Sequence, residues 1–333
     1  MKNGDFLNTG QSIETEYIVE DLLMKNRMAM VASVPGQGKS LFSVALLYHI
    51  AYAAPFLGKQ VCLGNVMLID SENRRDVLVT RIKKIRKGLE SDGYKKQAEV
   101  DIQHYCGLLL DDKNTWTPIV NELRSLQPSL IVFDHLLCFH NQDEDRARPM
   151  ERVAEAIEEM MTICGSSVVI LHHFNKNRGS FFQRLRGSSA IHAKTDTSYE
   201  VRSLLHREGK LEKIGIIPQP RKEKILPPFR VRIEEGDDWL KLIWDGTFEP
   251  VEDPRMDTLC HQIYHIFIQD KDSKTVYAVK EILAGLASDS EIRDCLRTLY
   301  EKELVTVGRV GKGHKYLYRL KRRERCPWCG IKI

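Results

Sequence analysis

The chain has 333 residues, of which 42% are hydrophobic and 29% are charged, and its formal net charge is +4. No apolar stretch approaches the roughly 20 residues that a membrane-spanning helix needs, which excludes an integral membrane protein, and the polar, acidic N-terminus excludes a secretory signal. The eight cysteines are scattered apart from one close pair near the C-terminus, so we expect free thiols in a reducing cytoplasm and not a disulfide framework.

The length predicts one large domain followed by a small one. We expect a short lead-in and a core over residues 1–27 and 28–245, then a linker over 246–256 that is rich in Gly, Glu, Asp and Pro. A second domain would occupy 257–322, and a basic tail 323–333.

A glycine-rich turn lies between the first predicted strand and the first long helix. Met28–Ala32 is an apolar run, Leu41–Ala54 reads as a helix, and residues 34–40 between them are Val-Pro-Gly-Gln-Gly-Lys-Ser. The spacing G-x-x-x-x-G-K-[ST] of a phosphate-binding loop would place Gly at position 33. Ser33 stands there instead, and because Ser is small we expect the close packing of the helix to survive.

The residue types of this turn suit the triphosphate of ATP and its Mg²⁺ ion. Gly36 and Gly38 let successive N–H groups point at one spot, to which the following helix adds its positive end. Lys39 supplies a charge for the β- and γ-phosphates, and the Ser40 hydroxyl can bind Mg²⁺. The predicted nucleotide contacts are Val34, Pro35, Gly36, Gln37, Gly38, Lys39, Ser40 and Leu41.

Three further apolar runs end in polar side chains: Val66–Asp70, Leu130–Asp134 and Ser167–Leu171. The first leads to Glu72, the second closes with Asp134, and the third leads to the pair His172 and His173. Because parallel strands place their carboxyl ends at the same edge of a sheet, we expect these groups to meet there. A buried strand that stops with an acid beside the phosphate loop is the Walker B pattern, in which Asp134 can hold the Mg²⁺ shell.

Strands that alternate with helices across residues 28–171 predict an α/β fold, with a mostly parallel twisted sheet and helices on both faces. Val100–Tyr105 is a weaker candidate for one of its strands. Glu200–Ile217 and Phe229–Trp244 look like later strands, several with alternating polarity, so we expect them to extend the sheet in antiparallel fashion.

Beyond the linker, three helices and a hairpin predict a winged helix-turn-helix. Two helices are expected at Leu259–Ile268 and Val276–Leu286. Ser288 and Glu291 form a capping box that opens the third, and residues 304–320 read as the hairpin. Cations of this domain could contact a DNA phosphate backbone, while the alternative is a surface for protein contact. The cations are Arg293, Arg297, Arg309, Lys312 and Lys315.

This ordered set of motifs resembles the RecA/DnaB-like superfamily of P-loop ATPases, and it is similar, more narrowly, to the RepA-like hexameric helicase family of plasmids and phages. The resemblance implies a RecA-like core, a homo-oligomer that forms a hexamer, ATP and Mg²⁺ as ligands, and single-stranded DNA as a partner. The matching stretches are Ala32–Ser40, Ala54–Gly58 leading to Val66–Glu72, Leu130–Asp134, Leu171–Lys176 and Arg186–Ala190.

The resemblance also implies roles for the residues at the strand ends. Glu72 would be the base that polarises the attacking water, with the adjacent Asp70 as a competing candidate. Asp134 would be the Walker B acid. Either His172 or His173 would sense the γ-phosphate and couple its loss to the loop that follows.

Ring ATPases complete their site with an arginine from the neighbouring subunit, because the transition-state charge needs a further cation. Arg186 is the first candidate for that arginine and Arg221 the second. The sequence does not choose between them.

Residues 175–186 mix cations with aromatic rings, a combination that suits single-stranded nucleic acid. In the resembled family the corresponding loop faces a central channel. The alternative is that the two phenylalanines pack between subunits. The predicted DNA contacts here are Lys176, Arg178, Phe181, Phe182 and Arg184.

The pair Cys326 and Cys329, in the run Cys-Pro-Trp-Cys-Gly, has the spacing of a zinc knuckle. Zinc takes four ligands, and a second pair does not follow in the sequence. His314 or another subunit could contribute; free thiols are the alternative.

These observations predict an ATP-hydrolysing, ring-forming motor on single-stranded DNA, a helicase of a replication system or mobile element. The alternative is an ATP-gated DNA-binding regulator or loader, in which the winged helix binds duplex DNA and no unwinding occurs. A recombinase-type filament protein is disfavoured because no N-terminal polymerisation arm is evident. We expect no membrane partner.

Overall fold

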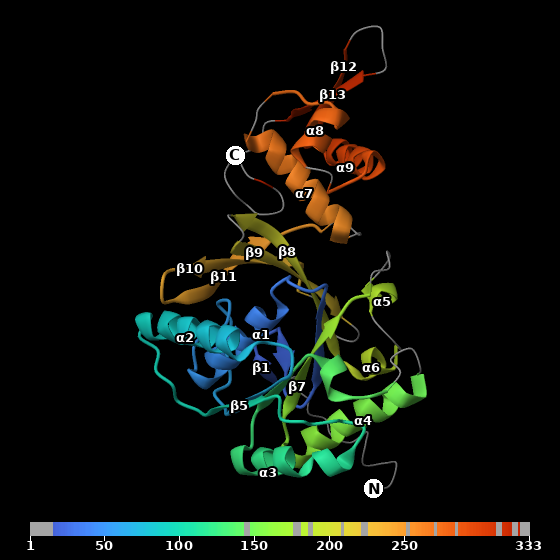
Figure 1. Ribbon diagram of the computed structural model, residues 1–333. Helices are drawn as coiled ribbons and strands as arrows, with labels where there is room; N and C mark the ends of the chain where they lie inside the picture. The colour runs from blue at the N-terminus through green and yellow to red at the C-terminus, as the bar shows by residue number, and fades with distance from the viewer. Residues whose placement is uncertain are drawn as a thin grey trace, which may run out of the picture.

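The computed structural model describes residues 16–142, 147–175, 181–185, 189–207, 210–220, 226–250, 254–269, 272–283, 286–310, 315–321 and 326. Within this part of the chain, one sheet of nine strands forms the centre of the larger domain (Figure 1). From one edge to the other its strands are β11 (Leu240–Thr247), β10 (Phe229–Glu235), β9 (Lys210–Pro220), β8 (Thr197–Arg207), β3 (Met28–Ser33), β7 (Ser167–His173), β6 (Leu130–Asp134), β4 (Val66–Asp70) and β5 (Val100–His104).

The pairing of the strands changes from parallel to antiparallel at β8. All pairings from β8 through β3, β7, β6 and β4 to β5 are parallel, whereas β8, β9, β10 and β11 pair antiparallel. The prediction of a mostly parallel sheet with an antiparallel extension is therefore confirmed, and the weaker strand candidate is present as β5. The order places β3, which leads into the glycine-rich loop, in the interior of the sheet.

Helices cover both faces of the parallel half, as predicted. One hydrophobic cluster joins the sheet to α1 and α2, and a second joins the opposite face to α3 and α4. Because both faces are covered, the interior strands are buried along their whole length. The helices are α1 (Lys39–Ala51), α2 (Arg75–Ser91), α3 (Thr117–Leu126), α4 (Ala147–Cys164), α5 (Phe181–Arg184) and α6 (Ser189–Lys194), with short 3-10 turns at Lys113–Thr115 and Leu136–Phe139.

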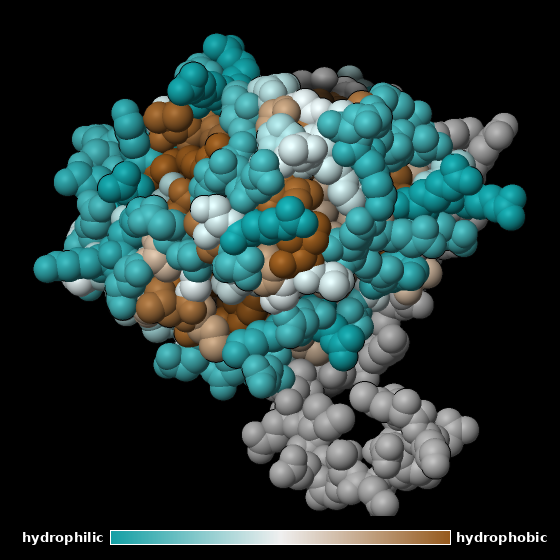
Figure 2. All heavy atoms as spheres, turned by 90° about the horizontal axis from the view of Figure 1, so that it is seen from below, coloured by the Kyte–Doolittle hydropathy of each residue, from teal (hydrophilic) through white to brown (hydrophobic). Residues whose placement is uncertain are grey.

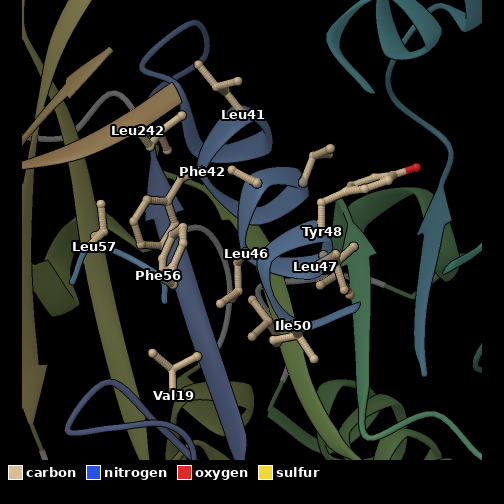
Figure 3. Packing of buried hydrophobic residues seen from close by; sticks show 14 of the residues in the cluster. Val19, Leu41, Phe42, Leu46, Leu47, Tyr48, Ile50, Phe56, Leu57 and Leu242 are labelled. Atoms are coloured by element: carbon tan, nitrogen blue, oxygen red, sulfur yellow. The ribbon is translucent and has the colours of Figure 1, made fainter. Parts of the chain in front are cut away.

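The helix α1 is apolar on most sides because it runs through the interior. Figure 3 shows the rings of Phe42 and Phe56 meeting edge to face, with Leu242 of β11 beside them, and their centroids lie 5.2 Å apart. Leu46 and Ile50 continue the buried surface along the helix. This packing holds the first turn of α1, and with it the loop, in a fixed position.

The lead-in contains a small hairpin of β1 (Tyr17–Val19) and β2 (Leu23–Met24). It is attached to the core, since the buried hydroxyl of Tyr199 on β8 donates a hydrogen bond to the carbonyl of Leu22. The described part of the lead-in is thus packed onto the larger domain.

In the described residues of the C-terminal region, three helices and a hairpin surround a core of their own. The capping box is formed as predicted: the Ser288 side chain accepts from the Glu291 amide, and the Glu291 carboxylate accepts from the Ser288 amide. The last strand of the sheet and the first helix of this region both extend into the predicted linker. The elements are α7 (Pro254–Gln269), α8 (Val276–Ile282), α9 (Asp289–Glu301), β12 (Val305–Val310) and β13 (Lys315–Leu320).

The surface seen from below is mostly hydrophilic (Figure 2). Hydrophobic side chains gather there in separate patches, with hydrophilic side chains between them. In the described part of the chain, every helix is too short or too polar to cross a lipid bilayer.

Candidate functional site

The glycine-rich loop leaves β3 and enters α1 through two residues with left-handed backbone. Gly36 has φ 80° and Gly38, the N-cap of α1, has φ 95°, a region that side chains other than glycine rarely adopt. A Cβ atom on Gly38 would also lie 2.9 Å from Cδ2 of Leu211 and 3.2 Å from Cγ2 of Ile214. Side chains of β9 therefore pack so closely against the loop that position 38, with its left-handed backbone, favours glycine.

Ser33 occupies the position where the usual loop spacing has glycine. It is the last residue of β3, its side chain is fully buried, and its Oγ donates to the carbonyl of Val34 at 2.8 Å. The buried hydroxyl thus has an acceptor, and the loop begins directly after it.

The side chain of Gln37 connects the loop to the sheet by hydrogen bonds. Its Oε1 accepts hydrogen bonds from the amide of Ser203 at 2.6 Å and from the hydroxyl of Ser203 at 2.7 Å. Ser203 lies on β8, so the side chain of Gln37 joins the loop to the strand at which the sheet turns antiparallel.

Lys39 brings its ammonium group to the ends of two strands. Its side chain is 5% exposed, and its Nζ lies 3.3 Å from Oε2 of Glu72 and 3.4 Å from Nε2 of His173. Glu72 follows β4 and His173 ends β7. The structure thus places one cation, one carboxylate and one imidazole, far apart in the sequence, at one point.

Two histidines keep the Glu72 carboxylate ionised. His135 Nδ1 lies 3.0 Å from Oε2 of Glu72, and His173 Nε2 lies 3.2 Å from Oε1. Hydrogen bonds from His135 and then His173, together with the charge of Lys39, hold the pKa of Glu72 well below its usual range, against the opposing effect of burial. The two imidazole rings meet edge to face at 4.3 Å.

The structure chooses between the two candidate histidines of β7. Successive residues of a strand point to opposite faces, and β7 places His172 beside Ala32 and His173 beside Ser33. His173 contacts Lys39 and Glu72, whereas His172 is buried and lies on the other face of the sheet. Of the two candidates for the sensor role, His173 is therefore the one beside Lys39 and Glu72.

Asp134 and Asp70 end neighbouring strands in register and are bridged by Asn73. The Nδ2 of Asn73 donates to Oδ2 of Asp134 at 2.9 Å and to Oδ2 of Asp70 at 2.5 Å, while its amide donates to Oδ1 of Asp70 at 3.0 Å. Asp70 is engaged in this bridge and Glu72 pairs with Lys39. Of the two candidates for the base, Glu72 is therefore the one beside the cation of the loop.

The environment of Asp134 suits a hydrated cation. Burial raises the pKa of Asp134 to about 6, and the charges of Asp70 and Glu72 add to this rise, while Lys39 and the Ser40 hydroxyl oppose it. Its Oδ1 atom is buried and has no hydrogen-bond partner in the part of the chain that the structure describes. Carboxylate and hydroxyl oxygens are ligands that Mg²⁺ takes, usually with several waters retained, so Asp134 and Ser40 fit that ion.

Three residues near these carboxylates were not singled out from the sequence. Asn73 and His135 each directly follow a predicted site residue, and that adjacency is the signal that could have found them. Arg81 on α2 lies near the acids: burial lowers its pKa, opposed by the charges of Asp134, Asp70 and Glu72. The helical spacing of α2 gave no indication of that placement.

The prediction of DNA contacts in the loop of residues 175–186 is wrong for two residues. The ring of Phe181 is 4% exposed and packs edge to face on Phe174 at 5.4 Å. Arg184 is also buried, donates to both carboxylate oxygens of Glu200 at 2.9 and 2.7 Å, and lies over the ring of Phe174. These two side chains belong to the core of the domain and are not presented to a nucleic acid.

The remaining cations of that loop, Lys176, Arg178 and Arg186, lie outside the described residues, as does the side chain of Phe182. Arg221, which follows β9 in the sequence, also lies outside them. The base of the loop is described, and the amide of Asn175 donates to the carbonyl of Arg184 at 2.7 Å. This hydrogen bond therefore joins the described residues on either side of 176–180, and it begins two positions beyond His173.

In the C-terminal region, Arg293 and Arg297 lie exposed on α9, one turn apart. Lys315 begins β13, and Lys312 lies outside the described residues, as does Cys329. Cys326 is 1% exposed. All seven cysteines in the described part of the chain are free thiols, as expected.

Comparisons with known proteins found a matching family model and a similar solved structure. A family model described as "AAA domain" (AAA_25) matches residues 5–179, which is more than half of the chain. The KaiC-like protein PH0186 from the hyperthermophilic archaeon Pyrococcus horikoshii OT3 is similar over 68% of this chain and 93% of that chain, at 12% identity and a TM-score of 0.44. At that identity and score, the second likeness carries no argument about function.

Proposed function

The chain belongs to the AAA-domain family, and from this premise we propose that it is a RecA-like P-loop ATPase, a ring-forming motor that hydrolyses ATP and acts on single-stranded DNA. The observation that carries the proposal is the meeting of Lys39, Glu72 and His173 within 3.4 Å of one another at the loop. A cation for the phosphates and an ionised carboxylate at one strand edge are groups that the hydrolysis of a phosphoanhydride uses.

Each of these groups has a chemical task in the proposed reaction. The backbone of residues 34–40 and the ammonium of Lys39 bind the phosphates. Ser40 and Asp134 would hold Mg²⁺, which when bound neutralises charge on the phosphate oxygens. Glu72, whose carboxylate is ionised, accepts a hydrogen bond from the attacking water and so orients it, and it takes up the proton as the water attacks.

His173 is suited to couple hydrolysis to the DNA loop. Its Nε2 is shared between Lys39 and Glu72, so a change at either group alters its contacts. Two residues later, Asn175 is hydrogen-bonded to the backbone of Arg184 at the base of the loop. We therefore assign the loop residues 176–180 to the DNA contact, with Lys176 and Arg178 as its cations, and leave Phe181 and Arg184 out of it.

In this proposal, each subunit of the ring supplies an arginine to the nucleotide site of its neighbour. Transition-state charge on the γ-phosphate is stabilised in such enzymes by an arginine from a neighbouring subunit. Arg186 and Arg221 remain the two candidates.

A strand-displacement assay tests the proposal. We expect the wild-type chain to separate a short duplex with a single-stranded tail in an ATP-dependent reaction, and Lys39→Ala to abolish both displacement and hydrolysis. Lys59→Ala, which removes a surface ammonium paired with Asp21, is the matched control and should behave as wild type. Absence of ATP hydrolysis by the wild-type chain, with or without single-stranded DNA, would contradict the proposal.

One observation favours a second candidate function, an ATP-gated DNA-binding regulator or loader. Arg293 and Arg297 are exposed on the helix that follows the capping box, where a winged helix would contact duplex DNA. ATP-dependent binding to duplex DNA without displacement would support this function over the motor. Arg293→Ala and Arg297→Ala should then weaken duplex binding and reduce its dependence on salt.

A further inference from the structure

Two histidines and a cysteine of the C-terminal region lie together, although the cysteine is distant in sequence. His261 and His265 occupy consecutive turns of α7, and Cys326 returns to them from beyond β13. One candidate ligand atom from each of the three lies within 4.8 Å of the other two. The imidazole centroids are 4.5 Å apart at an interplanar angle of 83°.

This arrangement has the chemistry of a zinc site. Thiolate sulfur and imidazole nitrogen are the usual zinc ligands, and at their ordinary bond lengths the ligands of one tetrahedral ion lie roughly 3.5 Å from each other. The three ligand atoms, within 4.8 Å of one another, lie near that separation. His261 is 4% exposed and Cys326 is 1% exposed, so water is largely excluded from two of the three ligands, as is usual in structural sites.

The spacing of the two histidines follows from the helix. Residues four apart on an α-helix lie one above the other on the same face, so one ion can bind both His261 and His265 without distortion of α7. The third ligand, Cys326, lies beyond β13 in the sequence and brings that part of the chain to the same face of α7. Core packing alone would be satisfied by apolar residues at these positions, as it is at the neighbouring Ile263 and Phe267.

We propose that His261, His265 and Cys326 bind one Zn²⁺ ion, with Cys329 as the fourth ligand. The assignment of Cys329 rests on the sequence, because a Cys-x-x-Cys spacing lets both thiolates reach a single tetrahedral ion. The site would join the end of the chain to the first helix of the C-terminal region. It is independent of the nucleotide site and of the function proposed for it.

Such an ion would have a structural task. The C-terminal core is small, with a single cluster formed by α7, α8, α9 and the hairpin, and small domains commonly depend on a metal or a disulfide for stability. Zinc binding contributes directly to folding when the ligands come together only in the folded chain. We expect the ion to stabilise α7 and the tail together.

Metal analysis of the full chain gives the first test. Protein purified without added chelator should contain one zinc ion per chain, as should the controls Cys62→Ser and His206→Gln, which alter an exposed thiol and an exposed imidazole. Cys326→Ser and His265→Ala should lose the ion on dialysis. A wild-type chain without zinc, even after refolding with the ion, or a Cys326→Ser chain that retains it, would overturn the proposal.

Cobalt substitution tests the ligand set. The Co²⁺-loaded wild type should show the intense visible bands of a tetrahedral site and a thiolate charge-transfer band in the near ultraviolet. Cys329→Ser should weaken the charge-transfer band by about half. An unchanged band in Cys329→Ser would exclude Cys329 from the site.

Two further measurements distinguish metal binding from misfolding, because neither of them removes a zinc ligand from the protein. His265→Cys replaces one zinc ligand by another and should retain the ion. Removal of zinc from the wild type by a chelator should lower the unfolding temperature of the C-terminal region, and added Zn²⁺ should restore it. If the chelator leaves that temperature unchanged, the ion has no structural task.

Discussion

Lys39 and Glu72 form an ion pair with Nζ 3.3 Å from Oε2, although 33 positions separate them in the chain. The cation that would bind the phosphates and the carboxylate that would activate water are thus side by side. His135 and His173 contact the same carboxylate from the ends of two other strands. The pair is therefore part of a cluster in which a change of charge at one residue alters the electrostatic interactions of the others.

Replacement of Glu72 by its neutral isostere should separate nucleotide binding from hydrolysis. Glu72→Gln keeps the size of the side chain but cannot accept a proton, so turnover should fall by roughly 10²- to 10⁴-fold. The affinity for a fluorescent ATP analogue should stay within a few-fold of wild type. Glu99→Gln, at an exposed position where the carboxylate pairs with Lys96, serves as the control. Undiminished turnover in Glu72→Gln would remove the carboxylate from the reaction.

Alanine at the two loop glycines should have unequal effects. Gly36→Ala meets no atom within 4 Å and suffers only the left-handed backbone, which costs about 1–2 kcal/mol. Gly38→Ala adds a collision with Leu211 and Ile214, so it should weaken ATP binding more strongly. Parallel titrations of the two variants measure this, and equal affinities would show that β9 does not restrict the loop.

Asn73→Ala should destabilise the fold, because it leaves two buried carboxylates without a shared donor. Loss of hydrogen bonds to such groups costs about 1–3 kcal/mol, measurable as a lower free energy of unfolding in urea. Asn114→Ala provides the control, since Asn114 donates to Asp112 in a similar way at an exposed site. The prediction is contradicted if the two variants lose the same stability.

Glu200 should make the fold sensitive to acid. It is 1% exposed and accepts hydrogen bonds from both Arg184 and Arg202. Burial would raise the pKa of Glu200, but hydrogen bonds from Arg184 and Arg202 and their charges lower it below its usual value near 4.5. A depressed carboxyl pKa means that the stabilisation is present at neutral pH and is lost as the pH falls through that lower value.

The measurement is the unfolding free energy of Glu200→Gln and wild type as a function of pH. At neutral pH the variant should be less stable by about 3–5 kcal/mol, because the two buried guanidinium groups lose their counter-charge. The difference should narrow as the pH is lowered below about 4.5, where protonation of Glu200 removes the same charge from the wild type. A difference that is independent of pH would show that the carboxylate is not ionised in the fold.

Much of the larger domain could be predicted because its signals are local or ordered along the chain. The alternation of apolar runs with helices determined the parallel sheet, and the capping box at Ser288 located the start of α9. Lys39, Glu72 and Asp134 could be grouped because the ends of parallel strands share an edge. These inferences required only the order of the elements.

The remaining features depend on contacts that no local pattern encodes. Phe181 and Arg184 were expected at the surface because cations and rings alternate there, but Glu200, sixteen positions later, supplies a buried counter-charge that draws Arg184 inward. The choice of His173 over His172 depends on which face of the sheet carries α1. The meeting of Cys326 with α7 depends on how the tail returns after the hairpin.

The two hydrogen bonds between Gln37 and Ser203 connect the glycine-rich loop, through β8, to the C-terminal region. Two positions after Ser203, Leu205 on the same strand packs against the hydrophobic cluster of the C-terminal region. The loop can therefore shift only if both hydrogen bonds of Gln37 break or if β8 moves with it. In the second case a displacement at the phosphates reaches the C-terminal helices through Ser203 and Leu205 of β8.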